Sequence, residues 1–238
     1  FVAIIPATAN PYCAVERSAS GQTTIRYTFD GLNPNPRNVN LMHSDFADGL
    51  TKVTVPLGFR HALAHVEILV TQEDVAIDPA SNILYYEVVL ESMSVDGIHR
   101  HGTYTVTSND QNSNNHVWTY EPTDPTTNIA YPIAGGSRSL NPGNVKNNYN
   151  PNDGNPIYVM PQNLSDDAKF NIDYHVITHT TSGISTGATQ SVSVQMNTIT
   201  DAGANKISAW HTNKIIRYTI NITPVHSLEG IQFNVKEE

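Results

Sequence analysis

Apolar and polar residues alternate with a period of two through almost every patterned segment of this 238-residue chain. Such alternation is typical of β-strands with one buried face, because successive side chains on a strand point to opposite sides. The clearest examples are the segments 170–176 and 216–222. No comparable segment follows the 3.6-residue period of a helix. We therefore expect an all-β protein.

Composition agrees with this expectation and excludes two classes of partner. Asn, Thr and Ser are abundant, and these residues compete with helical backbone hydrogen bonds. The formal net charge is −9 with 13 Lys and Arg, and no basic block occurs. Binding to nucleic acid or to an anionic membrane surface needs such a block. No apolar run approaches the ~18 residues of a membrane-spanning helix.

The order of strands and turns predicts two antiparallel β-sandwich domains in tandem. About ten short strands with turn signals between them are typical of sandwiches or barrels. A polar stretch at 108–115 and a Gly-, Asn- and Pro-rich stretch at 135–156 indicate a domain junction or a long surface loop. The predicted domains are residues 1–120 and 121–238.

The alternation changes phase in one place. Apolar residues of 53–59 follow one phase and those of 66–70 the other, with the slip between His61 and His65. A one-residue slip turns every later side chain to the opposite face, so we expect a bulge or a break there. The residues predicted to lie in the cores are Phe59, Leu63, Tyr174, Val194, Tyr218, Ile220 and Phe233.

The segment 183–187 (GISTG) matches the G-x-S-x-G motif of serine hydrolases, with Ser185 as the nucleophile. That motif requires a strand before it and a helix after it. Here a Gly/Ser/Thr turn between two strands explains the residues equally well. We therefore predict no catalytic residue and a non-enzymatic protein.

The candidate metal ligands also have plainer structural interpretations. His99 and His101 have a spacing that can hold Zn²⁺, but further ligands are not identifiable and an exposed turn is the plainer interpretation. His61 and His65 are expected to serve packing. The segment 148–155 (NYNPNDGN) fails the calcium-loop pattern. The adjacent carboxylates Asp166 and Asp167 are expected to be solvated, so no metal or cofactor is predicted.

With these strands in place, six segments in sequence resemble the fimbrillin family, the type V pilins and related adhesins of Bacteroidetes-type bacteria. The strongest match is 55–66, VPLGFRHALAHV, which is similar to the pattern V-x-L-x-F-x-H-A-L-A-K-V. The other matching segments are 1–6, 39–42, 97–104, 159–162, and 210–220 with 231–233.

The resemblance implies transthyretin-like sandwiches and a fimbrial subunit or fimbria-associated adhesin at the outer-membrane surface. It implies other pilus subunits as partners, joined by strand addition, and host or bacterial surface ligands. A lipid anchor would lie upstream of residue 1, since Cys13 lacks the small apolar residues expected before a lipoprotein cysteine. Family members carry further strands before the segment 1–6, so we expect an incomplete N-terminal sandwich. The alternative is a monomeric glycan- or protein-binding module.

Overall fold

The computed structural model describes most of the chain from residue 58 onward and selected parts before it. The described residues are 4–5, 13–17, 19, 23–28, 41–44, 58–106, 116–120, 129–131, 136–151, 157–224 and 231–238. Within them the regular elements are strands and two 3₁₀ segments, η2 (Pro142–Asn144) and η3 (Met196–Thr198). The predicted all-β class is confirmed. No helix in this part of the chain is long and apolar enough to cross a membrane.

Two sheets form the larger part of the molecule. The first has the order β10–β7–β14–β15, with β11 also paired to β7 and β16 also paired to β14. Its strands are β7 (Ile83–Asp96), β10 (Ile129–Tyr131), β11 (Arg138–Ser139), β14 (Lys169–Thr180), β15 (Gly183–Thr186) and β16 (Gln190–Gln195). The second has the order β12–β6–β18–β19. Its strands are β6 (Ala64–Gln72), β12 (Ile157–Val159), β18 (Ile215–Ile222) and β19 (Ile231–Glu237).

The buried faces of these two sheets contact each other through aromatic side chains. Phe170 of β14 packs edge-on against Tyr218 of β18, with ring centroids 5.0 Å apart, and lies 6.3 Å from the ring of Phe233. Every second residue of 170–176 and 216–222 is buried, as the alternation predicts. The indole N–H of Trp210 donates to the Tyr218 hydroxyl at 3.0 Å, which satisfies both buried polar groups.

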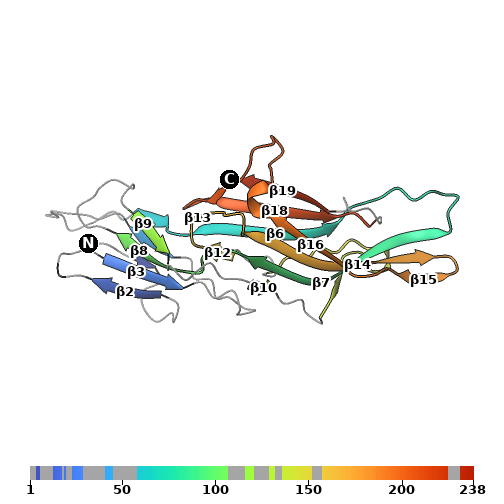
Figure 1. Ribbon diagram of the computed structural model, residues 1–238, viewed down its shortest axis with the longest axis horizontal. Coiled ribbons are helices and arrows are strands. Elements are labelled where there is room, and N and C mark those ends of the chain that lie inside the picture. Colours follow the sequence, from blue (N-terminus) through green and yellow to red (C-terminus); the bar gives the residue numbers. More distant parts are fainter. Residues whose placement is uncertain are drawn as a thin grey trace.

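Two further sheets lie at the other end of the elongated molecule, where Figure 1 shows β2, β3, β8 and β9. One sheet has the order β2–β3–β8–β9, and the other β1–β4–β5. The strands are β1 (Ile4–Ile5), β2 (Cys13–Arg17), β3 (Thr23–Thr28), β4 (Met42–Ser44), β5 (Phe59–His61), β8 (His101–Val106) and β9 (His116–Tyr120). Ile25, Leu41, Tyr104 and Val106 are buried here.

The chain crosses between the two groups of sheets more than once. After β5 it enters the larger group for β6 and β7, and it then returns for β8 and β9. Strands β6 and β7 pair with β18 and β14, which lie far later in the sequence. A cut at residue 120 would separate strands that are hydrogen-bonded to each other, so the division of the chain into domains stays a prediction.

One pairing departs from the expected antiparallel arrangement. Strands β6 and β18 run parallel, from Ile215 opposite His65 to Ile222 opposite Gln72. Both strands bury every second residue. Two parallel strands cannot be joined by a tight turn and need a long crossover connection. More than 140 residues of sequence separate the two strands, so no local turn signal could reveal the direction.

The predicted break occurs at Ala62 and Leu63, between the end of β5 and the start of β6. The Ala62 amide donates to the carbonyl of Leu41 at 2.8 Å, and the indole N–H of Trp118 donates to the Ala62 carbonyl at 2.8 Å. Both backbone groups of Ala62 therefore have hydrogen-bond partners, as a buried residue requires.

Most predicted core residues are confirmed, with three differences. Leu63, Tyr174, Tyr218 and Ile220 are buried. Val194 and Phe233 are half-buried and pack against the core from its margin. The prediction for Phe59 is wrong: this side chain is 37% exposed. It lies on the short strand β5 (Phe59–His61), which pairs only with β4 among the described strands.

The part of the Gly/Asn/Pro-rich stretch that is described, 136–151, packs against the larger sheets. Leu140 and Tyr149 are buried, and the backbone of Tyr149 exchanges two hydrogen bonds with Val70 of β6. The side-chain amide of Asn141 donates to the carbonyl of Tyr86 at 2.9 Å. The Tyr149 contacts reach β6 and the Asn141 contact reaches β7, so this part of the stretch is held against both sheets.

A short contact region joins the two groups of sheets. The side chain of Gln162, on β13 (Gln162–Asn163), accepts from the His99 amide at 2.7 Å and donates to the His99 carbonyl at 3.1 Å. Strand β13 pairs with β17 (Ala209–Trp210). Gly97 has φ +70°, and a Cβ atom there would lie 2.1 Å from the carbonyl oxygen of Asp167. Only glycine fits this backbone position.

Candidate functional site

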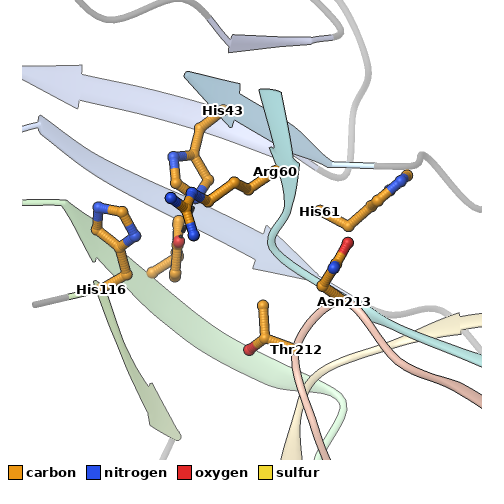
Figure 2. A pocket seen from close by; sticks show the side chains of 7 residues that line it. His43, Arg60, His61, His116, Thr212 and Asn213 are labelled. Atoms are coloured by element: carbon orange, nitrogen blue, oxygen red, sulfur yellow. Dashed lines mark hydrogen bonds between the residues drawn. The ribbon is translucent and has the colours of Figure 1, made fainter. Parts of the chain in front are cut away.

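A pocket with a volume of about 300 Å³ lies where the two groups of sheets meet. It is shown in Figure 2 and is lined by His43, Arg60, His61, Tyr104, His116, Thr212 and Asn213. These side chains come from β4, β5, β8 and β9 on one side and from the turn between β17 and β18 on the other. Sequence positions about 170 residues apart therefore contribute to one concave surface.

His43 and Tyr104 form the inner wall of the pocket. Each is only 1% exposed, and the Tyr104 hydroxyl lies 2.7 Å from Nε2 of His43. Nδ1 of His43 lies 3.2 Å from the backbone carbonyl oxygen of Ser44, which can only accept. The neutral imidazole that satisfies both contacts carries its proton on Nδ1 and accepts from the Tyr104 hydroxyl through Nε2.

Aromatic contacts hold this wall in place. The His43 ring meets His116 edge-on, with centroids 4.4 Å apart, and Tyr104 lies 5.0 Å from Trp118. Trp118 is in turn fixed by its hydrogen bond to the Ala62 carbonyl. The wall of the pocket is therefore anchored to the bend between β5 and β6, and its side chains have little freedom to move.

Arg60 and His61 are neighbours on β5 and point in opposite directions, as successive strand residues do. In Figure 2 the Arg60 side chain extends toward His43 and His116, whereas the His61 side chain extends away from them. An arginine guanidinium stays protonated in proteins and presents five donors. None of the described residues that line the pocket is acidic.

The turn that closes the pocket contains a strained residue. Asn213 has φ +60°, a left-handed conformation that Asn and Asp adopt more readily than other non-glycine residues. Its amide donates to the carbonyl of Leu63 at 3.2 Å, which ties the turn to the bend after β5. Thr212 and Asn213 are exposed, so their hydroxyl and amide groups are available at the pocket mouth.

The structure places the G-x-S-x-G segment in a β-hairpin. Strand β14 leads into a turn at residues 181–182, and β15 begins at Gly183 and contains Ser185. Ser185 is exposed and pairs with Thr178 of β14. A nucleophile elbow needs a helix after the serine, and a strand occupies that position here. The interpretation as a turn between two strands is the one that fits.

The structure shows the surroundings of the histidines that were considered as metal ligands. The ring of His99 stacks on Tyr120 at 4.5 Å, and His101 begins β8. Nε2 of His65 lies 3.2 Å from a Glu67 carboxylate oxygen. Burial lowers the pKa of His65, with smaller contributions in the same direction from Arg217 and His61. In the part of the chain that the structure describes, no three His, Cys, Asp or Glu side chains are placed to hold a metal ion.

The remaining candidates also have ordinary structural roles. The Asp166 carboxylate accepts from the side-chain amide of Asn197 at 2.8 Å, at an exposed position. Within the segment 148–155, Tyr149 pairs with β6, while residues 152–155 lie outside the described residues.

Sequence reasoning missed the two histidines at the centre of the pocket. His43 lies two residues after Leu41, on the same buried side of its segment, and His116 precedes Trp118 by two. A polar residue on the apolar phase of a strand needs a buried hydrogen-bond partner, and this signal could have singled out His43. Nothing local could have placed Arg60 or Asn213 beside them.

Comparison with known proteins gives matches among solved structures. No model of a known protein family matches the chain, and neither does any curated protein. A fimbrial protein from Bacteroides vulgatus aligns over 100% of this chain and 75% of its own, with a TM-score of 0.57 and 14% identity. A protein from Bacteroides uniformis assigned to cell adhesion aligns over 100% of this chain and 70% of its own, with a TM-score of 0.52 and 16% identity. This chain therefore has the fold of these fimbrial and adhesion proteins, as its resemblance to the fimbrillin family predicts.

Proposed function

We propose that this protein is a non-enzymatic fimbrial subunit or fimbria-associated adhesin of the bacterial cell surface. The observation that carries the proposal is the alignment of the whole chain with a fimbrial protein and an adhesion protein. The order of the resembling sequence segments supports it independently, because they are distributed from residue 1 to residue 233. A fold alone does not decide function, so the proposal requires a direct test.

The surroundings of Ser185 and His43 favour a structural or binding role over catalysis. Ser185, the residue that a hydrolase would use, lies exposed on a hairpin strand. The buried imidazole of the pocket, His43, is hydrogen-bonded to a tyrosine hydroxyl and to a backbone carbonyl. A general base would instead need to reach a nucleophile or a substrate proton.

Assembly by strand addition is the second part of the proposal. Among the described strands, β9 pairs only with β8, β2 only with β3, and β19 only with β18. A strand at the margin of a sheet presents backbone groups that can pair with a strand of another chain. We infer that other pilus subunits bind in this way, at the N-terminal sheets, and that a lipid anchor upstream of residue 1 attaches the protein to the outer membrane.

The test is to locate the protein on cells that produce it and to delete its gene. Antibodies against the purified chain should label intact cells, and sheared surface filaments should contain the chain in a ladder of assemblies. Loss of the gene should reduce attachment to host or bacterial surfaces. Labelling that appears only after cell lysis would contradict the proposal.

The pocket favours a second candidate, a monomeric surface module that binds glycans or proteins. A concave surface with convergent polar groups is the usual form of a small-ligand site. The two candidates differ in one observation. The chain would appear at the cell surface in both cases, but only a fimbrial subunit would be recovered in sheared filaments.

A further inference from the structure

We propose that a second pocket, which lies along strands β18 and β19, binds a neutral sugar residue of a surface glycan. The inference deepens the proposed adhesive role and rests on that role for the choice of a glycan as the source of the ligand. The second pocket has a volume of about 530 Å³. Its lining comes from one face of β18 and β19 and from the segment 201–207 that follows η3.

The floor of the second pocket is the outer face of the β18–β19 pair. Thr219 of β18 is opposite Asn234 of β19, and Arg217 is opposite Lys236. Directly opposed residues of two antiparallel strands have their side chains on the same side of the sheet. Tyr218, between Arg217 and Thr219, is buried in the core, so these four side chains lie on the opposite, outer side.

A short turn forms the wall of the second pocket beside β19. The carboxylate of Asp201 accepts hydrogen bonds from the backbone amides of Gly203 and Asn205, both at 2.8 Å. The side-chain amide of Asn205 donates to the same carboxylate at 3.1 Å. The Val235 amide donates to the carbonyl of Thr200 at 3.3 Å, which attaches the turn to β19. The wall is therefore held in place by its own hydrogen bonds, and less ordering is needed on binding.

The basic side chains of the lining already have acidic partners. Nε of Arg217 donates to a Glu67 carboxylate oxygen at 2.6 Å. The ammonium group of Lys236 forms an ion pair with the Glu238 carboxylate. An anionic ligand would have to compete with these carboxylates for the two cations.

The acidic side chains of the lining are also engaged. The Glu237 carboxylate lies 3.6 Å from Nζ of Lys214 and 3.5 Å from Nδ1 of His211. The Asp201 carboxylate accepts the hydrogen bonds of its own turn. A cationic ligand would have to replace these partners. The second pocket therefore favours a neutral ligand over a charged one.

Two neutral polar side chains on the floor retain their hydrogen-bonding capacity. Within the described part of the chain, neither the Thr219 hydroxyl nor the Asn234 side-chain amide makes a hydrogen bond. Both groups can donate and accept, as the hydroxyl groups of a sugar do. Ala202, Ile207 and Val235 add apolar surface for the C–H groups of a sugar ring. Apolar walls with a few convergent polar groups are typical of small-ligand sites.

The edge of β19 favours a sugar over an extended peptide. An added strand would need a continuous row of available backbone groups along β19. The Val235 amide, which lies within this strand, already donates to Thr200. A sugar bound through side chains does not need this backbone group. The volume of about 530 Å³ lies within the usual range for small-molecule sites and can hold a mono- or disaccharide.

The binding test uses the purified chain and three neutral probes: methyl β-galactoside, methyl α-mannoside and methyl β-N-acetylglucosaminide. Binding is followed by calorimetry and by the NMR signal of the Asn234 side-chain amide. The expected result is saturable binding of at least one probe with a shift of that signal. Absence of saturable binding for all three probes would overturn the proposal.

The charged counterparts of the probes test the preference for a neutral ligand. The galacturonide and the mannuronide carry a carboxylate, and the glucosaminide carries an ammonium group. Each should bind at least about fivefold more weakly than its neutral counterpart, because the charge loses hydration without gaining a free partner. Equal or tighter binding of the charged counterparts would overturn the proposal. Tighter binding of a capped tetrapeptide of alternating threonine and valine would overturn it in favour of a peptide.

Two variants and two controls assign the binding to the second pocket. Thr219→Val removes the hydroxyl and keeps a β-branched side chain, and Asn234→Ala removes the amide from an exposed position. Each should weaken binding about fivefold, the usual effect of one lost hydrogen bond. The controls are Thr103→Val on β8 and Gln232→Ala on β19, at positions outside the pocket. Both should leave affinity unchanged.

Thermal melting of each variant verifies that it is folded. Unchanged affinity in both pocket variants, or equal losses in the pocket and control variants, would overturn the proposed site. Either result would leave the fimbrial proposal intact, because labelling of intact cells and recovery in sheared filaments do not depend on binding of these sugars.

Discussion

The hydroxyl of Tyr104 and Nε2 of His43 are 2.7 Å apart in a position where both side chains are almost completely buried. They come from different sheets, β8 and β4, and their hydrogen bond connects these sheets across the inner wall of the pocket. Each group is the buried partner that the other needs, since an unsatisfied polar atom in a core costs free energy.

Tyr104→Phe should therefore destabilise the protein. The substitution keeps the ring but leaves Nε2 of His43 without this partner, at a cost of about 1–3 kcal/mol in the free energy of unfolding. Urea denaturation measures the change. The control is Tyr85→Phe, where the ring that stacks on His179 is retained at a partly exposed position, and the change should be within about 0.5 kcal/mol. Equal losses in the two variants would contradict the role assigned to the hydrogen bond.

Gly97→Ala should be strongly destabilising. The new Cβ atom would lie 2.1 Å from the Asp167 carbonyl oxygen, in a backbone conformation with φ +70°. The contact and the strained conformation together should cost about 3 kcal/mol or more. Gly136→Ala is the matched control, because φ is +81° there but no atom lies within 4 Å. It should cost only about 1–2 kcal/mol of backbone strain. Denaturant melts that show equal costs would argue against the close approach at Gly97.

The loss of stability on truncating an aromatic side chain to alanine should increase with the burial of that side chain. Tyr218→Ala removes a fully buried ring and its hydrogen bond with Trp210, and should cost about 3–5 kcal/mol. Phe233→Ala, at the margin of the same core, should cost less. Phe59→Ala should cost less than Tyr218→Ala, about 1 kcal/mol, because 37% of the residue is already exposed to water. A large loss for Phe59→Ala in denaturant melts would restore the prediction that it is a core residue.

His65 should make the protein less stable in mild acid. Burial is the main cause that holds the pKa of this imidazole below its usual value, so the unfolded chain binds the proton more tightly. Stability is then complete above the unfolded pKa of about 6.5 and is lost as the pH falls through the lower pKa of the folded state. In thermal melts between pH 7.5 and 5, His65→Gln should reduce this loss. The exposed His211→Gln is the control and should retain it.

Many of the individual strands could be predicted from local pattern. The alternation in 170–176 and 216–222 identifies the buried face of β14 and β18 residue by residue, because neighbouring side chains on a strand must face opposite sides. The phase slip before His65 likewise located the bend at Ala62 and Leu63. Gly97 was recognisable as a turn residue, although the close contact with Asp167 was not.

The sequence by itself thus determined the all-β class, the buried phase of the long strands and the position of the break. Only the tertiary structure decided the partners of those strands: the parallel pairing of β6 with β18, the return of β8 and β9 to the N-terminal sheets, and the exposure of Phe59. The pocket belongs to this second group, since His43, Arg60, His116 and Asn213 meet only when the sheets pack together. The physical reason is that alternation is a property of adjacent residues. Pairing depends instead on the fit of side chains distant in sequence, whose contacts exist only after the chain has closed on itself.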